Sequence, residues 1–99
     1  MKNNLDSQEI NQLFDAIISL ETKEECRAFF KDICTINELV TVAQRFDVGI
    51  RLLQGSTYQE VSKETGASTA TISRVRRLLH DDEYGLEMAA ERINKAKSE

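Results

Sequence analysis

Apolar residues recur three and four positions apart along almost the whole chain. No stretch alternates between apolar and polar residues as a half-buried strand does. This spacing predicts an all-α protein. Helices are expected over residues 7–20 and 83–97, and another is expected to begin after Thr22. The longest helix is expected over residues 35–54.

The longest predicted helix is apolar on more than one face. Val40, Val48 and Leu52 lie off its main apolar stripe, so contact with more than one neighbouring element is expected. The stripe itself consists of Leu39, Val42, Ala43, Phe46, Ile50 and Leu53.

Capping signals mark several of the helix ends. Thr22, Thr35 and Thr57 are each followed three residues later by a glutamate, which is the spacing of a capping box. Gly55 is expected to end the longest helix in the left-handed conformation. Ser68 is a favourable N-cap for the helix that follows it. These signals divide the middle of the chain into one long and two short helices.

Residues 57–79 have the pattern of a helix-turn-helix. Val61 in the first short helix and Ile72 and Val75 in the second are expected to face inward. Gly66 lies between the helices, where the turn favours a positive φ that a residue with a Cβ adopts only at a cost. We therefore expect two short helices packed at a steep angle.

The second short helix has the composition of a helix that reads DNA. Its first residues are small and polar, so its N-terminus can approach base edges in the major groove, and arginines follow where phosphates would lie. Hydrogen bonds to bases are expected from Thr69 and Thr71, with methyl contacts from Ala70 or Thr71. The predicted DNA-binding residues are Gln59, Lys63, Ser68, Thr69, Ala70, Thr71, Ser73, Arg74, Arg76 and Arg77.

The formal net charge of the chain is -4, but the charge is unevenly distributed. Residues 1–40 carry -4, residues 41–80 carry +3 and residues 81–99 carry -3. A polyanion is therefore expected to bind the central segment. Short α-helical hairpins with a solvated arginine face also occur in proteins that never bind nucleic acid. A protein-interaction or adaptor dimer thus stays open as the alternative.

Length and composition limit the remaining classes. A chain of 99 residues with 40% apolar residues fits one domain with a small core, which favours an oligomer. No apolar run approaches the roughly 18 residues of a membrane span, and the first residues do not have the pattern of a positively charged segment followed by an apolar one that a signal peptide would show. We expect a soluble, cytoplasmic protein, with residues 7–54 and 83–97 as dimerisation and core helices and residues 57–79 as the reading head.

Neither catalysis nor metal binding is expected. The spacing of Cys26 and Cys34 is not that of zinc ligands, so both are expected to be reduced and to lie in or near the core. No base–nucleophile arrangement accompanies His80, so the protein is not expected to be an enzyme.

Two segments resemble the trp repressor family, and within it the YerC/YecD-type branch. Residues 66–74 read GASTATISR, and residues 35–55 read TINELVTVAQRFDVGIRLLQG. The resemblance covers residues 35–79. It implies an intertwined homodimer whose paired reading helices bind the two halves of a palindromic operator, and hence a transcriptional regulator that represses by occupying that operator.

In that family tryptophan acts as a corepressor between the long helix and the reading helix. The resemblance implies an effector pocket in which Arg45 and Arg74 flank the ligand and the backbone of Thr35 helps to hold its amino group. Val75 and Leu78 depart from this pattern, because tryptophan-binding members have a glycine and a serine there. A valine would fill the space of the indole ring. No tryptophan cofactor is therefore expected; a smaller effector, or a plain surface ion pair for Arg45, stays open.

Overall fold

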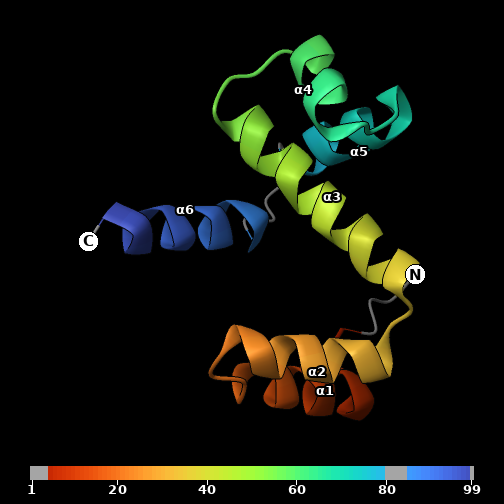
Figure 1. Cartoon of the computed structure of the whole chain (residues 1–99), viewed down its shortest axis with the longest axis vertical. Helices are drawn as coiled ribbons and strands as arrows, with labels where there is room; N and C mark the ends of the chain where they lie inside the picture. Colours follow the sequence, from red (N-terminus) through yellow and green to blue (C-terminus); the bar gives the residue numbers. More distant parts are fainter. Residues whose placement is uncertain (1–4, 80–84, 99) are drawn as a thin grey trace. The chain divides into compact units, whose positions relative to one another are not determined.

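The computed structural model describes residues 5–79 and 85–98, which form six helices and no strand (Figure 1). The chain divides into two compact units, Met1–Asn37 and Glu38–Glu99. The helices are α1 (Gln8–Ile18), α2 (Lys23–Ile33), α3 (Ile36–Leu53), α4 (Tyr58–Thr65), α5 (Thr69–Leu79) and α6 (Gly85–Ser98). The expected all-α class is confirmed. The predicted start of the last helix at residue 83 and His80 both lie outside the described residues.

Side-chain caps begin both helices of the first unit. Ser7 Oγ accepts from the backbone N–H of Ile10 at 3.2 Å, and Thr22 Oγ1 accepts from that of Glu25 at 3.1 Å. The carboxylate of Glu25 accepts from the backbone N–H of Glu21, at 2.8 Å, and not from that of Thr22 as the capping box predicted. The Thr22 cap is therefore present, but the Glu25 side chain bonds to the residue before Thr22 and not to Thr22 itself.

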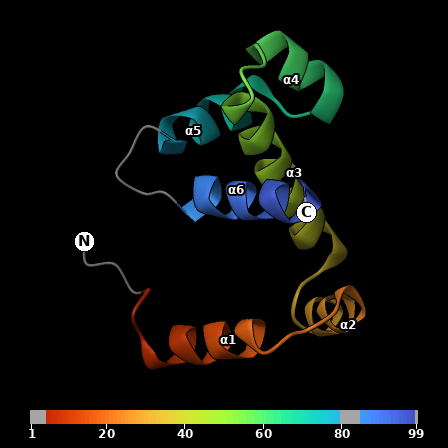
Figure 2. The same ribbon diagram turned by 90° about the vertical axis from the view of Figure 1, so that its left-hand side faces the viewer.

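The helices of the first unit bury no residue. Ile18 is 79% exposed, and Phe14 and Ile33 are also exposed. Cys26 is exposed and Cys34 half-buried, so the expectation of a core or near-core position was wrong for Cys26. The reason is that neither α1 nor α2 buries a residue, so these helices form no interior in which Cys26 could lie. Figure 2 shows α1 and α2 from a second direction.

The core of the second unit forms where α3, α4 and α5 meet. Val61, Ile72 and Val75 are buried there, as the helix-turn-helix pattern predicted. Leu79 and Leu86 pack against this core from its edge. Its buried members are Val48, Leu52, Val61, Ala67, Ile72 and Val75.

Two faces of α3 have different surroundings. Val48 is fully buried and Leu52 is 4% exposed, and both pack into the core with α4 and α5. Val42, in the main apolar stripe, is 58% exposed, and Leu39 and Leu53 are also exposed. Val40, which also lies off the stripe, is 60% exposed. Contact with a neighbouring element is therefore found at Val48 and Leu52 but not at Val40, and much of the stripe is left uncovered.

Close packing of α6 against α3 depends on Gly49, which is buried. A Cβ at Gly49 would lie 2.5 Å from Leu86 Cδ1 and 3.1 Å from Leu86 Cγ. The absence of a side chain is what allows Leu86 to pack here. The sequence pattern did not predict this contact, because a glycine inside a helix has no local signature of the partner that it admits.

Gly55 ends α3 as predicted, with φ +92°. The backbone N–H of Ser56 donates to the carbonyl of Arg51, and that of Gly55 donates to the carbonyl of Leu52, both at 3.1 Å. These two bonds make a Schellman motif. They satisfy carbonyls at the end of α3 and turn the chain towards α4.

Candidate nucleic-acid interface

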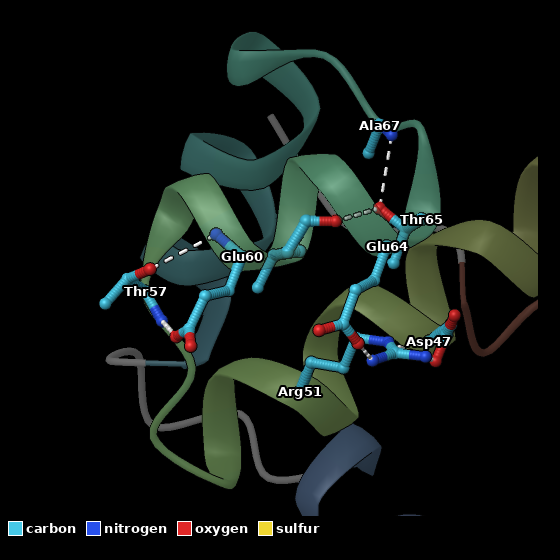
Figure 3. A network of polar contacts seen from close by, with 8 residues as sticks. Asp47, Arg51, Thr57, Glu60, Glu64, Thr65 and Ala67 are labelled. Carbon is cyan, nitrogen blue, oxygen red and sulfur yellow. Dashed lines mark hydrogen bonds and ion pairs between the residues drawn. The ribbon is translucent and has the colours of Figure 1, made fainter.

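A reciprocal capping box begins α4 (Figure 3). Thr57 Oγ1 accepts from the backbone N–H of Glu60 at 3.1 Å, and Glu60 Oε1 accepts from the backbone N–H of Thr57 at 2.7 Å. Hydrogen bonding of the Glu60 carboxylate to the backbone N–H of Thr57, and to a lesser extent to the Thr57 side chain, lowers the pKa of the Glu60 carboxyl. The predicted capping box is confirmed, and it orients the first turn of α4.

The turn between α4 and α5 is held by side-chain hydroxyls. Gly66 has φ +75°, the left-handed conformation expected of it. Thr65 Oγ1 donates to the carbonyl of Val61 at 2.6 Å and accepts from the backbone N–H of Ala67 at 3.1 Å. Ser62 Oγ donates to the carbonyl of Ala67 at 3.1 Å. Both polar backbone groups of Ala67 are therefore bonded, which determines how the chain enters α5.

Ser68 caps α5 as predicted. Its Oγ accepts from the backbone N–H of Thr71 at 3.1 Å and also lies 3.1 Å from Thr71 Oγ1, to which it donates. The hydroxyl of Thr71 is thus held by its neighbour and the residue is half-buried, whereas Thr69 is exposed. Of the two threonines predicted to contact bases, Thr69 has the freer side chain.

The predicted DNA-binding residues lie on α4, α5 and the turn between them. All are exposed except the half-buried Thr71. None of Arg74, Arg76 and Arg77 forms an ion pair with a carboxylate among the described residues. The reading head, residues 57–79, thus presents small polar side chains at the start of α5 and exposed guanidinium groups along it.

A shallow hollow of about 330 Å³ lies between α4 and the start of α5. Tyr58 and Ser62 contribute to it and were absent from the predicted set, although their spacing places them on one helical face beside Gln59 and Lys63. Its lining is Tyr58, Gln59, Ser62, Lys63, Thr69 and Ile72.

The residues of the implied effector pocket have different surroundings. Arg45, Arg74 and Leu78 are exposed, but the Val75 side chain is buried in the core of the second unit. Thr35 is exposed in the first unit. Val75 therefore contributes to the packing of the second unit. No described carboxylate forms an ion pair with Arg45.

A second hollow, also of about 330 Å³, lies between α3 and α6. Ile50 and Leu53 contribute to it from α3, and Ala90 and Ile93 contribute from α6. Its rim is polar. The sequence pattern placed these residues on apolar faces but did not predict that a space would open between them.

Two kinds of feature are absent from the described residues. None of these helices is long and apolar enough to cross a membrane. Across residues 5–79 and 85–98, no group of three or more histidine, cysteine, aspartate or glutamate side chains is arranged to hold a metal ion.

A glycine-turned pair of short helices, packed on a longer helix and bearing an exposed polar and basic face, defines a helix-turn-helix protein. The family model described as "Trp repressor protein" matches residues 8–94. The chain belongs to the Trp repressor family.

Individual relatives agree with this assignment. The uncharacterized protein YerC of Bacillus subtilis (strain 168) is 48% identical over 95 residues, which cover 96% of this chain and 91% of YerC. The crystal structure of a TrpR like protein from Eubacterium eligens ATCC 27750 matches with a TM-score of 0.89 and 45% identity, over 94% of this chain and 96% of that one. A second solved structure, from Staphylococcus aureus, matches with a TM-score of 0.88 and 45% identity, over 92% and 91% of the two chains. The YerC-type branch and the trp repressor-like fold are therefore confirmed.

Proposed function

We propose that the protein is a sequence-specific regulator of transcription that binds double-stranded DNA in the cytoplasm. It represses by occupying a palindromic operator as a homodimer. The observation that carries the proposal is the reading head, in which exposed small residues begin α5 and exposed arginines follow. Membership of the Trp repressor family supports the same proposal.

The uncovered apolar surface supports the homodimer. Val42 and Ile36 on α3 are exposed, as are Ile18 on α1 and Ile33 on α2. Large exposed apolar surfaces of this kind are usual at protein interfaces and rare on monomers. In this proposal residues 7–54 and 83–97 form the dimerisation core of a single domain, and a second copy covers these faces.

Within the reading head, Thr69 has the main part in base recognition and Thr71 a supporting one. Thr69 is exposed, whereas Thr71 Oγ1 is already bonded to Ser68. Arg74, Arg76 and Arg77 contact phosphates, and Gln59 and Lys63 contact the backbone from α4. Tyr58 and Ser62 line the same hollow and join this surface.

Operator binding does not require tryptophan in this proposal. Val75 takes part in the core that joins α3, α4 and α5, so its side chain fills space that an indole ring would need. The reading head is held to α3 by the protein's own side chains.

The deciding experiment is selection of binding sites from random duplex DNA, with purified protein, in the presence and absence of amino acids. Enrichment of a palindrome is expected, without dependence on tryptophan. Enrichment of a palindrome only in the presence of tryptophan would overturn the proposal that binding is independent of tryptophan, but not the proposal of DNA binding. No enrichment even at low salt, where basic heads bind most tightly, would overturn DNA binding.

Substitution of the reading-helix arginines tests the phosphate contacts. Arg74→Ala or Arg77→Ala should weaken binding to all sequences and reduce the slope of log affinity against log salt by about 1 each. Thr69→Ala and Thr71→Ala should change sequence preference more than affinity, Thr69→Ala the more strongly. Fluorescence anisotropy at several salt concentrations measures these effects. Arg27→Ala, which removes an exposed arginine from α2, is the matched control.

The alternative is a protein-interaction dimer that retains the fold without binding DNA. The acidic charge of residues 1–40 and 81–99 favours it, because acidic segments repel DNA. Recovery of one stoichiometric protein partner in a pull-down, with no enrichment of DNA, is the result that this alternative predicts.

A further inference from the structure

One face of α3 makes polar contacts with the end of α4. Gln44, Asp47 and Arg51 share this face, since they are spaced three and four residues apart. The guanidinium group of Arg51 pairs with the carboxylate of Glu64 and also with that of Asp47, at 3.2 Å from Nε to Oδ1. Figure 3 shows Arg51 of α3 reaching Glu64 of α4, with Asp47 alongside. At the other end of this face, Gln44 Nε2 donates to the carbonyl of Thr65 at 3.2 Å.

The residues that α3 contacts are those that lead into the turn. Glu64 and Thr65 are the last two residues of α4, and Gly66 follows them. The carbonyl of Thr65 is held by Gln44, while its hydroxyl accepts from the backbone N–H of Ala67 at 3.1 Å. A short series of hydrogen bonds therefore connects α3 to the turn that sets the direction of α5.

These contacts restrict orientation more than they stabilise the fold. Arg51 and Glu64 are 31% and 53% exposed at their side chains, and ion pairs as exposed as these contribute little to stability. The core of α3, α4 and α5 is apolar, and apolar attraction is non-directional. Gln44 and Arg51 lie seven residues apart, roughly 10 Å along the axis of α3, and their side chains converge on two adjacent residues at the end of α4. Directional contacts made from two separate points on α3 restrict rotation of the end of α4 in a way that apolar contacts do not.

We propose that Gln44 and Arg51 are positioning residues that set the angle of the reading head against α3. They thereby determine the separation of the two reading helices in the dimer. The inference rests on the proposed function. Two helices that bind adjacent major grooves on one side of DNA must lie about 34 Å apart, one turn of the duplex, so a small rotation of each head changes which half-site spacing fits.

The test is selection from a DNA library in which two copies of the enriched half-site are separated by spacers of varied length. The wild-type protein is expected to enrich one spacing. The double variant Gln44→Met, Arg51→Met should also enrich spacings one base pair longer and shorter. It should lose at least ten-fold in affinity for the best operator and change less than two-fold in affinity for non-specific DNA. A merely structural role would lower both affinities together without broadening the spacing.

A charge-reversed pair distinguishes loss of the ion pair from loss of folding, because the second substitution can restore the ion pair. Arg51→Glu alone places three carboxylates together and should broaden the spacing. Arg51→Glu with Glu64→Arg places an arginine between the carboxylates at positions 47 and 51 and should restore the single spacing. Arg27→Met, which removes an exposed ion pair within α2, should leave the spacing unchanged.

The outcomes separate this inference from the proposed function. If the wild-type protein enriches a half-site and the double variant retains its single spacing and affinity, the positioning role is overturned and the proposed function stands. If the wild-type protein enriches no DNA, the proposed function is overturned and this inference with it.

Discussion

Thr57 and Glu60 show how two side chains begin a helix that the rest of the reading head depends on. Each accepts a hydrogen bond from the backbone N–H of the other, so two donors that α4 cannot satisfy internally are paired. Glu60 is exposed, and its lowered pKa arises mainly from the bond donated by the Thr57 backbone. The cap is therefore strongest when Glu60 is ionised.

This cap predicts a pH dependence of stability. Because the pKa of Glu60 in the folded protein lies below its ordinary value of 4.5, the added stability is present above that value and is lost as the pH falls through the folded pKa. Glu60→Gln keeps the shape but not the charge. The difference in free energy of unfolding between wild type and Glu60→Gln should therefore shrink in acid, as followed by urea titration at several pH values. A difference that stays constant from neutral pH to pH 3 would contradict this.

At the scale of the element, α5 has one face for packing and another for contact with a partner. Ile72 and Val75, three positions apart, share the buried face, whereas Ser73 and Arg76, the next residue after each, are exposed. Thr69, in the first turn of α5, is also exposed. Substitutions on α5 should accordingly divide into those that affect folding and those that affect binding.

Ile72 and Thr69 test this division. Ile72→Ala should destabilise the fold by about 2–5 kcal/mol, since it leaves a cavity in the core, and Ile72→Val by about 0.5–1.5 kcal/mol. Thr69→Ala should change stability by less than about 0.5 kcal/mol. Urea unfolding at one fixed protein concentration measures the effect, because the stability of a dimer depends on concentration. Equal costs for Ile72→Ala and Thr69→Ala would contradict the assignment of faces.

At the scale of the whole molecule, the chain has more apolar surface than it covers. Its first unit buries no residue in α1 or α2, and on α3 the apolar stripe around Val42 stays exposed. A small chain obtains only a limited core by folding alone, and association is a common way to extend it. The uncovered faces are thus the physical reason to expect a dimer.

A charge on the stripe tests the dimer directly. Val42→Glu should shift the protein towards monomer, because a carboxylate buried in an apolar interface loses its hydration without a partner. Sedimentation equilibrium measures the change in mass. Thr41→Glu, at a neighbouring exposed position on α3, adds the same charge and should leave the dimer largely intact. A wild-type protein that sediments as a monomer at micromolar concentration would contradict the prediction.

Much of the helix-turn-helix could be predicted from the sequence. The signals of Thr57, Gly66 and Ser68 depend on residues only a few positions away, and each occurs where expected. The inward positions of Ile72 and Val75 follow from helical spacing alone. The hydrogen bond of the Glu25 carboxylate departs from expectation, because this flexible side chain can accept from the backbone N–H of either Thr22 or Glu21.

Other features needed the assembled chain. Helical periodicity identifies apolar faces on α3, but it does not predict which face is buried within the chain. The buried residues Val48 and Leu52 lie off the predicted stripe. The Gly49–Leu86 contact joins residues far apart in the sequence, so no local pattern announces it.

The sequence by itself determined the helical class, the helix-turn-helix at residues 57–79 and the family, because capping, turns and helical spacing are local properties of the chain. Only the tertiary structure decided which face of α3 packs inside the chain and which residues tie it to α4. The pairing of Arg51 with Glu64 is an example. Such contacts join side chains that are far apart in the sequence and depend on how the helices pack. No single segment of the sequence carries a signal for that arrangement.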